Sequence, residues 1–328
     1  MTGGLFDSFH RRIDYLRVSV TDRCNLRCIY CTVRLAPHLS HYDILRYEEI
    51  QMILQAAAEL GIRSVRLTGG EPLVRPDLPT LVELLSQVEG IDDISLTTNA
   101  TLLAKYATGL KVAGLNRVNI SLDTFKPDRF RHITGSDKLG DVLAGIEAAM
   151  KAGLHPIKIN MVVLKGINDD ELPEFAQMSL SDGWHVRFIE HMPMVAPWAE
   201  ADQLVAVGDM METIQRSIGQ LEPCLVASGT GPAKYYRLPG AEGTIGFIGA
   251  LTDCFCSQCN RLRLTADGRL RPCLLADDEV DIKGPLRSGA SIDDLKRFMQ
   301  EAAALKGERH KLGQGFIPSK RQMWQIGG

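Results

Sequence analysis

The sequence has no long hydrophobic run. No stretch of its 328 residues approaches membrane-spanning length, and the first residues lack the apolar segment of a signal peptide. It also lacks a strong charge of either sign, because 37 Lys and Arg against 40 Asp and Glu leave a net charge of −3. Without an overall basic field, nucleic acid and anionic membranes are not attracted. We therefore expect a cytoplasmic protein that binds neither and captures any anion through local groups.

The length and composition predict one large or two modest domains. The chain is about twice the typical domain length, and 45% hydrophobic residues can form a sizeable core. In a reducing cytoplasm the eight cysteines are better interpreted as metal ligands and spare thiols than as disulfides.

The most informative motif is Cys24-x3-Cys28-x2-Cys31. Three thiolates are one short of the four that complete a four-iron cluster, so one iron is left to bind a small molecule. Two alternatives stay open from the residues alone. One is a zinc site completed by a water or by a histidine such as His38 or His41, and the other is a set of inert buried thiols.

A second cysteine set, Cys256-x2-Cys259 followed by Cys273, again offers three thiolates. The residues 261–271 alternate in type around an Asp-Gly pair, which predicts a β-hairpin that folds Cys273 back beside Cys259. Strand alternation then puts Cys259, Arg261 and Arg263 on one face. Two guanidinium groups beside a cluster ligand indicate an anionic ligand, although exposed arginines on a strand face are the common alternative.

The first 190 residues or so show the rhythm of βα units around a parallel sheet. Apolar spacing predicts helices at Ile50, Ile53, Leu54 and Ala57 and at Leu143, Ile146 and Met150. Glycines that would end helices precede several of the strands. The six predicted strands are Tyr15–Val20, Ser64–Thr68, Asp93–Thr97, Arg117–Leu122, Ile157–Val163 and His185–Ile189.

Six units are fewer than the eight of a complete barrel, so we expect an incomplete (β/α)6 TIM-like barrel with a lateral opening, or an open sheet. Polar residues follow the strands at the ends where barrel chemistry occurs, in 68–72, 97–99, 121–123 and 190–192. The rhythm stops near residue 195. We therefore predict a partial-barrel domain over 1–195 and a smaller α+β region over 196–328, with a helix near Met210–Ile218 and the second cysteine set.

These motifs together carry a family resemblance. Cys24-x3-Cys28-x2-Cys31 with Tyr30 inside it, followed by Gly69-Gly70-Glu71-Pro72, resembles the radical S-adenosylmethionine superfamily. The second cysteine set, Arg261-x-Arg263, the run 234–237 and the terminal Gly327-Gly328 make the chain similar, nearly end to end, to the GTP 3′,8-cyclase family of molybdenum cofactor biosynthesis. The resemblance implies a lyase with two [4Fe-4S] clusters. S-adenosylmethionine bound at the first would yield a 5′-deoxyadenosyl radical, which takes hydrogen from ribose C3′ of GTP before guanine C8 is attacked.

The resemblance also implies roles for residues of this chain. Cys24, Cys28 and Cys31 would hold the first cluster, and Cys256, Cys259 and Cys273 the second, whose free iron would meet guanine. The same three N-terminal cysteines with Arg17, Arg261 and Arg263 would form the catalytic set. Contacts to S-adenosylmethionine would come from Tyr30, Gly70, Ser121 and Met192. Contacts to GTP would come from Arg17, Arg66, Thr97, Lys158, Arg261, Leu262 and Arg263, with Arg187 a weaker candidate.

Some implied features are less direct. The family implies a homodimer, an electron donor that the sequence does not identify, and a Gly327-Gly328 tail that enters the site. Thr32-Val33 departs from the Met-Pro usual in the family, and Arg34 to Arg46 gives no register. Cys254 is a thiol that could compete with Cys256, and Cys224 is interpreted as structural. Lys306, His310 and Arg321 belong to a basic segment typical of a solvated tail.

Two other functions remain as alternatives. One is another two-cluster radical enzyme, such as a peptide maturase, which ordinarily has more C-terminal cysteines and lacks the Arg-x-Arg pair and the Gly-Gly end. The other is a non-enzymatic binding protein in which zinc at both cysteine sets stabilises the scaffold.

Overall fold

The computed structural model describes residues 4–31, 38–192, 194, 204–225, 231–312, 316, 318 and 321–327. Three features predicted above lie outside the described residues: the domain boundary between 195 and 196, the Thr32-Val33 pair and the terminal Gly328.

A twelve-stranded sheet forms the centre of the molecule, in the order β14-β13-β12-β3-β4-β5-β6-β7-β8-β11-β10-β9. Every neighbouring pair from β3 to β8 is parallel, so the predicted α/β class with its parallel sheet is confirmed. The six strands are rich in β-branched residues and nearly fully buried, as expected for strands covered on both faces. Their bounds are β3 Tyr15–Ser19, β4 Ser64–Thr68, β5 Asp93–Thr98, β6 Arg117–Ser121, β7 Lys158–Val163 and β8 His185–Glu190.

Strands of the C-terminal region extend this sheet at both edges. β12 (Arg261–Leu264) pairs parallel with β3, and β11 (Thr244–Ile248) pairs parallel with β8. Antiparallel strands complete the edges, with β13 (Arg269–Arg271) and β14 (Val280–Asp281) beyond β12, and β10 (Lys234–Arg237) and β9 (Glu222–Pro223) beyond β11. Among the described residues no pairing joins β14 to β9, so the barrel is open.

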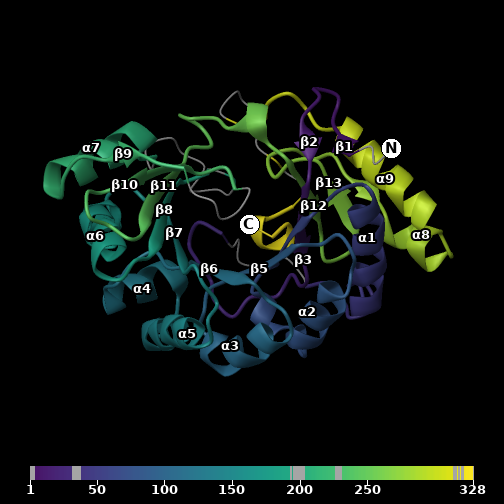
Figure 1. Cartoon of the computed structure of the whole chain (residues 1–328), viewed down its shortest axis with the longest axis horizontal. Coiled ribbons are helices and arrows are strands. Elements are labelled where there is room, and N and C mark those ends of the chain that lie inside the picture. The colour runs from purple at the N-terminus through teal and green to yellow at the C-terminus, as the bar shows by residue number, and fades with distance from the viewer. Residues whose placement is uncertain are drawn as a thin grey trace.

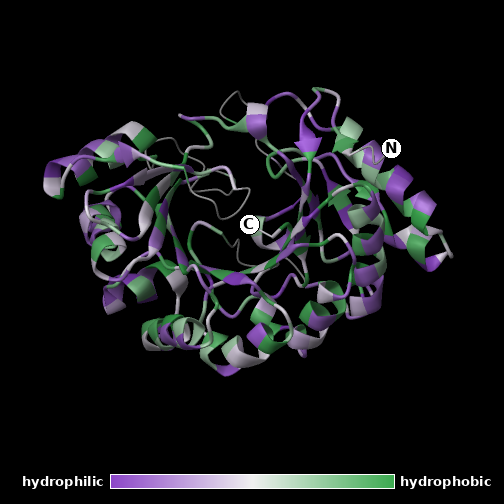
Figure 2. Cartoon of the chain, in the orientation of Figure 1, coloured by the Kyte–Doolittle hydropathy of each residue, from purple (hydrophilic) through white to green (hydrophobic). Residues whose placement is uncertain are grey.

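Helices cover the outer side of the curved sheet, and the C-terminus lies inside the arc (Figure 1). Hydrophobic and hydrophilic residues alternate along them (Figure 2), because one helix face packs on the sheet. The helices are α1 Tyr47–Glu59, α2 Leu78–Ser86, α3 Leu103–Val112, α4 Pro127–Thr134, α5 Leu139–Lys151, α6 Leu172–Ser181, α7 Val207–Ser217, α8 Lys283–Arg287 and α9 Ile292–Ala304.

The helix prediction was wrong in one detail. The α5 helix exists, but Leu143 and Met150 are 42% and 38% exposed. Its buried face includes Ile146 as predicted, together with Val142 and Ala149. By contrast, the face predicted from Ile50, Ile53, Leu54 and Ala57 in α1 is buried.

Short elements fill the remaining chain. They are strands β1 (Leu5–Phe6) and β2 (Arg12–Ile13), which pair with each other, and the 3-10 helices η1 Pro72–Val74, η2 Asp169–Glu171, η4 Cys256–Gln258 and η5 Met323–Gln325.

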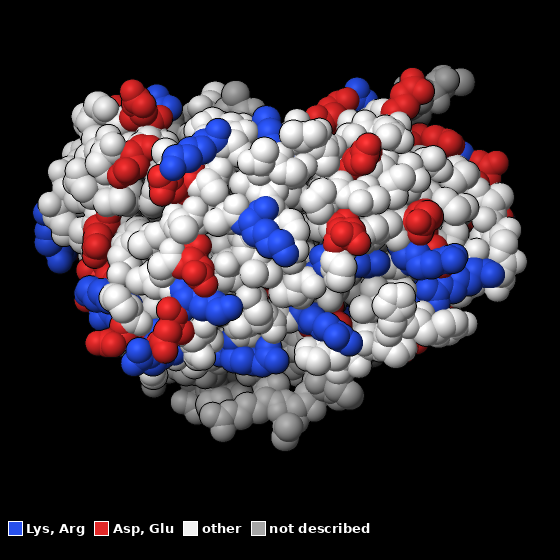
Figure 3. All heavy atoms as spheres, turned by 90° about the horizontal axis from the view of Figure 1, so that it is seen from below, with Lys and Arg blue, Asp and Glu red and all other residues white. Residues whose placement is uncertain are grey.

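The surface agrees with the composition. Lys and Arg are interspersed with Asp and Glu over the face in Figure 3, without a field of one sign. In the part of the chain that the structure describes, no helix combines the length and the apolar character needed to cross a membrane.

Candidate functional site

A cavity of about 300 Å³ lies inside the arc of strands. All six cysteines predicted as cluster ligands line it, although they lie up to 249 positions apart in the sequence, from Cys24 to Cys273. One internal space therefore collects both cysteine sets and the predicted arginines.

The first cysteine loop follows the C-terminal end of β3. Backbone hydrogen bonds tie it to the Gly-Gly-Glu-Pro turn after β4, from Gly70 N to Thr21 O at 2.8 Å and from Glu71 N to Arg23 O at 2.8 Å. A Cβ on Gly70 would lie 2.4 Å from Arg23 O, so only glycine allows this approach. The glycine motif thus sets the position of the cysteine loop.

Two buried carboxylates, Glu71 and Asp123, hold the segments in and around this loop. Glu71 accepts hydrogen bonds from the backbone of Leu73 and Asn99 and from the hydroxyl of Thr98, at 2.7 to 3.0 Å. Asp123 accepts a hydrogen bond from the Tyr30 hydroxyl at 2.6 Å, inside the cysteine motif. Burial raises the pKa of Glu71 to about 7 and that of Asp123 to about 6.

The N-terminal thiols form a suitable ligand set for a metal–sulfur group. Burial, followed by the charges of neighbouring cysteines, raises the pKa of Cys28 well above its usual range and that of Cys31 to about 12. Three crowded thiolates are therefore costly alone and are stabilised by bound iron. His38 and His41 are not grouped with these cysteines: His38 Nδ1 instead lies 3.4 Å from Asp22 Oδ2. Among the described residues, neither histidine is placed to complete a zinc site with these three cysteines.

The second cysteine set surrounds the start of β12. The predicted hairpin is confirmed, with Arg263 opposite Arg271 and Leu264 opposite Leu270. Lys306, expected in a solvated tail, is 4% exposed and donates to the carbonyls of Arg261 at 2.9 Å and Pro272 at 2.7 Å. It therefore links the residues that flank Cys259 and Cys273 in the hairpin.

The Cys259 thiol is prepared for ligation by this arrangement. Burial raises its pKa, but Arg261 and Lys306 outweigh burial and bring the pKa to about 6. Burial raises the pKa of Cys256, by contrast, to about 11. A bound metal would stabilise both as thiolates.

The two cysteine sets lie at opposite ends of the parallel strands. The first follows Ser19 at the end of β3, whereas Cys259 precedes Arg261, which pairs with Tyr15 at the start of β3. At about 3.3 Å per residue, the five residues of β3 separate them by roughly 16 Å. That distance leaves room for small-molecule ligands between them.

Arginines fill the space between the two sets. Arg263, Arg17 and Arg66 are direct neighbours in register across β12, β3 and β4, and all three line the cavity. Burial, then Arg263 and other arginines, lowers the pKa of Arg17 well below its usual range. Such a row of cations is destabilising unless an anion lies against it.

Several buried polar atoms around the cavity have no hydrogen-bond partner among the described residues. They come from β3, β5, β7 and β8 and from the residue that follows β8. The atoms are Tyr15 Oη, Arg17 Nε, Thr97 Oγ1, Asn160 Oδ1, Arg187 Nε and His191 Nε2. Buried polar groups are normally paired, so these atoms indicate a polar ligand.

Most of the predicted site residues line this cavity. Lys158 and Leu262 do not; both are buried, Lys158 close enough to Arg187, Arg117 and Arg66 for their charges to act on it. The lining also includes residues to which the sequence interpretation gave no role. These are Asn99, Asp123, Asn160, His191, Lys306 and His310. Asn99, Asp123 and His191 were noted among the polar residues that follow the strands and Asn160 lies within a predicted strand, whereas no spacing pointed to Lys306 or His310.

The C-terminal segment closes one side of the site. The carbonyl of Gly327 accepts hydrogen bonds from Thr68 Oγ1 at 3.1 Å and from Arg263 Nη1 at 3.4 Å. Trp324 contacts His38 edge to face, with ring centroids 5.5 Å apart. Arg321 pairs with Asp267 and Glu279, so this segment is not a free basic tail.

Family comparisons match the two halves of this architecture. Residues 18–179 match the radical SAM superfamily, and residues 184–312 match the Molybdenum Cofactor Synthesis C family. The fold resembles Streptococcus suis SuiB bound to S-adenosylmethionine, with a TM-score of 0.62 and 15% identity over 88% of this chain and 68% of that one. It also resembles native anSMEcpe with bound AdoMet, at TM-score 0.58 and 15% identity over 95% and 87%. The protein is a radical S-adenosylmethionine enzyme, a class that uses an iron–sulfur cluster.

Relatives that match over nearly their full length identify the family within this class. The chain is 49% identical to the GTP 3′,8-cyclase of Pelotomaculum thermopropionicum over 98% of this chain and 99% of the relative. It is 48% identical to that of Desulforamulus reducens over 99% and 100%. The chain belongs to the GTP 3′,8-cyclase family, a family of early molybdenum cofactor biosynthesis. Membership in this family favours neither the peptide maturase nor the zinc-stabilised binding protein.

Proposed function

We propose that this chain converts GTP into (8S)-3′,8-cyclo-7,8-dihydroguanosine 5′-triphosphate. One observation carries the proposal beyond family membership: two cysteine triads occupy opposite ends of one cavity, and a row of buried arginines lies between them. A triphosphate supplies the anion that this row requires, and a nucleotide fits the space of roughly 16 Å between the triads.

The proposal includes two [4Fe-4S] clusters. Cys24, Cys28 and Cys31 hold the first, and Cys256, Cys259 and Cys273 hold the second. Each triad leaves one iron without a protein ligand. When bound, the first cluster and S-adenosylmethionine supply the electron and the organic radical that remove hydrogen from ribose C3′.

Residues at the strand ends bind S-adenosylmethionine in this proposal. The backbone of Gly70 contacts the ligand beside Cys24. The two residues are close neighbours, since a Cβ added to Gly70 would lie 3.1 Å from Cys24 Cβ. Tyr30, fixed by its hydrogen bond to Asp123, orients the cysteine loop toward the cavity. Ser121 and Met192 follow from β6 and β8 and also face the cavity.

Basic residues hold GTP so that its ribose meets the radical. Arg17, Arg66 and Arg263 bind the phosphates as one row, and Lys158 and Arg187 add charge from β7 and β8. Thr97 donates to the ligand through a hydroxyl that has no partner among the described residues. Arg261 and the backbone of Leu262 lie beside the second cysteine set, where guanine binds. The cavity walls exclude water, which protects a reactive radical from quenching.

The remaining features of the proposal concern the whole protein. It acts as a cytoplasmic homodimer, receives electrons from an external donor, and comprises functional regions 1–195 and 196–328. The terminal Gly-Gly approaches the reaction, consistent with the contacts of Gly327 to Thr68 and Arg263.

The test is 5′-deoxyadenosine formation by anaerobically reconstituted protein given S-adenosylmethionine and a strong reductant, with and without GTP. We expect GTP to stimulate 5′-deoxyadenosine formation strongly and Cys24→Ala to abolish it. Cys224→Ala alters a cysteine outside the cavity lining and is the matched control, so it should have normal activity. Formation that is indifferent to GTP would reject the cyclase proposal while keeping the radical enzyme.

A further inference from the structure

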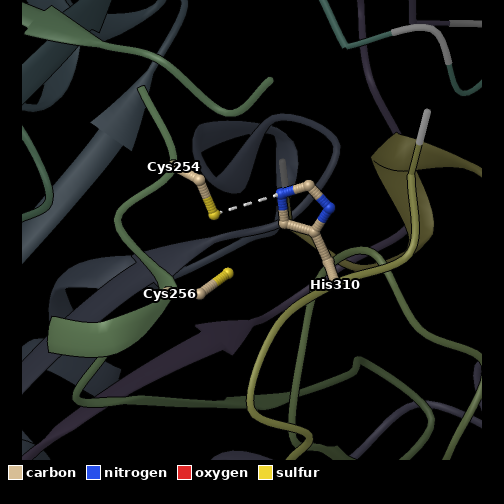
Figure 4. Close-up of side chains that lie close together, drawn as sticks. All are labelled: Cys254, Cys256 and His310. Atoms are coloured by element: carbon tan, nitrogen blue, oxygen red, sulfur yellow. Dashed lines mark hydrogen bonds between the residues drawn. The ribbon is translucent and has the colours of Figure 1, made fainter. Parts of the chain in front are cut away.

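A trio of metal-ligand side chains shares one residue with the predicted second cluster. Cys254, Cys256 and His310 each present one ligand atom, and the three atoms lie within 4.8 Å of one another. Figure 4 shows the two thiols and the imidazole edge pointing toward a common point. Cys256 belongs to the predicted second cluster, whereas Cys254 and His310 have no part in it.

The spacing suits a single ion better than a cluster. Cys254 Sγ lies 3.7 Å from His310 Nε2. In a tetrahedral zinc site, bonds of 2.3 Å to sulfur and about 2.05 Å to nitrogen place these two atoms roughly 3.6 Å apart. Cluster thiolates bind different irons and are farther apart, and neither predicted cluster triad forms such a tight group among the described residues.

The surrounding structure holds the trio in place. The Glu190 carboxylate accepts hydrogen bonds from the backbone of Leu251 at 2.9 Å and Thr252 at 3.1 Å, which fixes the turn before Cys254. His310 Nε2 lies 2.8 Å from Ala250 O, so a metal bond would replace one hydrogen bond of the ring. The ring proton would then reside on Nδ1, a buried atom that has no partner among the described residues. With a metal bound, a water would complete the tetrahedron.

We propose that Cys254, Cys256 and His310 form a mononuclear site for a thiophilic divalent ion, Zn²⁺, in the protein that lacks its second cluster. Two thiolates and one imidazole are ligands that zinc prefers. Because Cys256 is shared, the zinc-bound and cluster-bound states exclude each other. Zinc that binds before iron therefore blocks assembly of the second cluster.

The test uses full-length apoprotein prepared without oxygen and titrated with Co²⁺, whose visible and near-ultraviolet bands report thiolate and imidazole ligands, and then with Zn²⁺ in competition. We expect one ion to bind with an affinity that falls at least tenfold in Cys254→Ser and in His310→Gln. The matched control Cys224→Ser should bind as the unaltered chain does. Circular dichroism identifies any variant that fails to fold. If Cys254→Ser or His310→Gln does not fold, the other of these two variants provides the test.

A second measurement follows cluster assembly itself. Zn²⁺ added before iron and sulfide should lower the iron bound by the unaltered protein by the content of one cluster. The same treatment should inhibit Cys254→Ser at least tenfold less. Equal binding and equal inhibition in all four proteins would overturn the proposal, because the ion would then be held by the cluster cysteines alone. Neither outcome depends on whether GTP is the substrate.

Discussion

At the scale of single residues, the strands around the cavity are unusual for their buried cations. Burial, then the charges of Arg187, Arg117 and Arg66, lowers the pKa of Lys158 to about 6. Burial likewise lowers the pKa of Arg187 and of Arg263 to about 10. Keeping these side chains protonated costs free energy in the unliganded protein. An anion that binds beside them stabilises their charged forms.

Lys158 therefore predicts proton uptake on GTP binding. In the unliganded protein at pH 8 the Lys158 side chain is neutral because its pKa is about 6, and a nearby triphosphate would raise that pKa and protonate it. The affinity should fall by up to about tenfold per pH unit above 6, since binding requires one proton that the solution supplies less readily. Calorimetry at pH 8 in buffers of different ionisation enthalpy measures the uptake; GTP itself is then fully ionised.

Two variants complete this experiment. Lys158→Met should abolish the proton uptake, whereas Lys165→Met, an exposed lysine two residues beyond β7, should retain it. Binding heats that do not depend on the buffer in the unaltered protein would contradict the role of Lys158.

The hydrogen bonds of Lys306 predict that its replacement lowers both the stability of the protein and the iron content of the second cysteine set. Lys306→Met removes the donor to the carbonyls of Arg261 and Pro272, which leaves two polar groups unpaired. We expect the free energy of unfolding to fall by about 1 to 3 kcal/mol, together with a lower iron content. Denaturant titration and iron analysis measure the two effects. The exposed Lys311→Met is the control, and identical behaviour of the two variants would show that Lys306 is only a surface charge.

At the scale of elements, the loops after β3 and β4 act as one unit because their backbones are in direct contact. Gly70→Ala should break that contact, since its Cβ would lie 2.4 Å from Arg23 O and the cysteine loop would have to shift. We expect lower iron content and at least tenfold weaker binding of S-adenosylmethionine, with about 1 to 3 kcal/mol of lost stability. Iron analysis and equilibrium dialysis measure these changes.

Gly140→Ala is the matched control for this substitution. Gly140 lies on the exposed side of α5 with no atom within 4 Å of the added Cβ, so alanine should be neutral or stabilise the helix slightly. If Gly70→Ala retained full iron and ligand binding, the close packing of the two loops would not matter to the site.

The elements also show how far the sequence predicted the fold. The ends of the six strands β3 to β8 were predicted to within one residue, because each strand is a short β-branched run followed by polar residues. The exposed Leu143 and Met150 were assigned to the wrong face, since spacing of three and four residues does not distinguish neighbouring stripes on an apolar helix. The parallel pairing of β11 with β8 was not foreseen, because sheet partners distant in sequence leave no local pattern.

At the scale of the whole molecule, the sheet brings the two halves of the chain together. β12 adds to the β3 edge and β11 to the β8 edge, so the C-terminal region completes the walls of a cavity that the first half begins. The same arrangement places the two cysteine sets at opposite ends of β3. A group bound at one set can therefore react with a ligand that is bound at the other.

The candidate site could be predicted only in part, because some of its residues form local sequence patterns and others come together only in the fold. Cysteine spacing and the Arg-x-Arg pair are local patterns, so Cys24 to Cys31 and Arg261 to Arg263 were visible in the sequence. His310 lies 54 residues from Cys256 in a segment that looked like a solvated tail, and only the fold brings it to the thiols. Glu190 was noticed at the end of a strand, but its role in holding the turn before Cys254 depends on that long-range contact.

The central claim is that ribose C3′ of GTP meets the radical inside this cavity. Its most direct test is to supply GTP deuterated at C3′ to the reconstituted protein with S-adenosylmethionine and reductant, and to analyse 5′-deoxyadenosine and the nucleotide product by mass spectrometry. The account predicts one deuterium in 5′-deoxyadenosine and a cyclised nucleotide that has lost it. Unlabelled 5′-deoxyadenosine together with unchanged, fully deuterated GTP would contradict it.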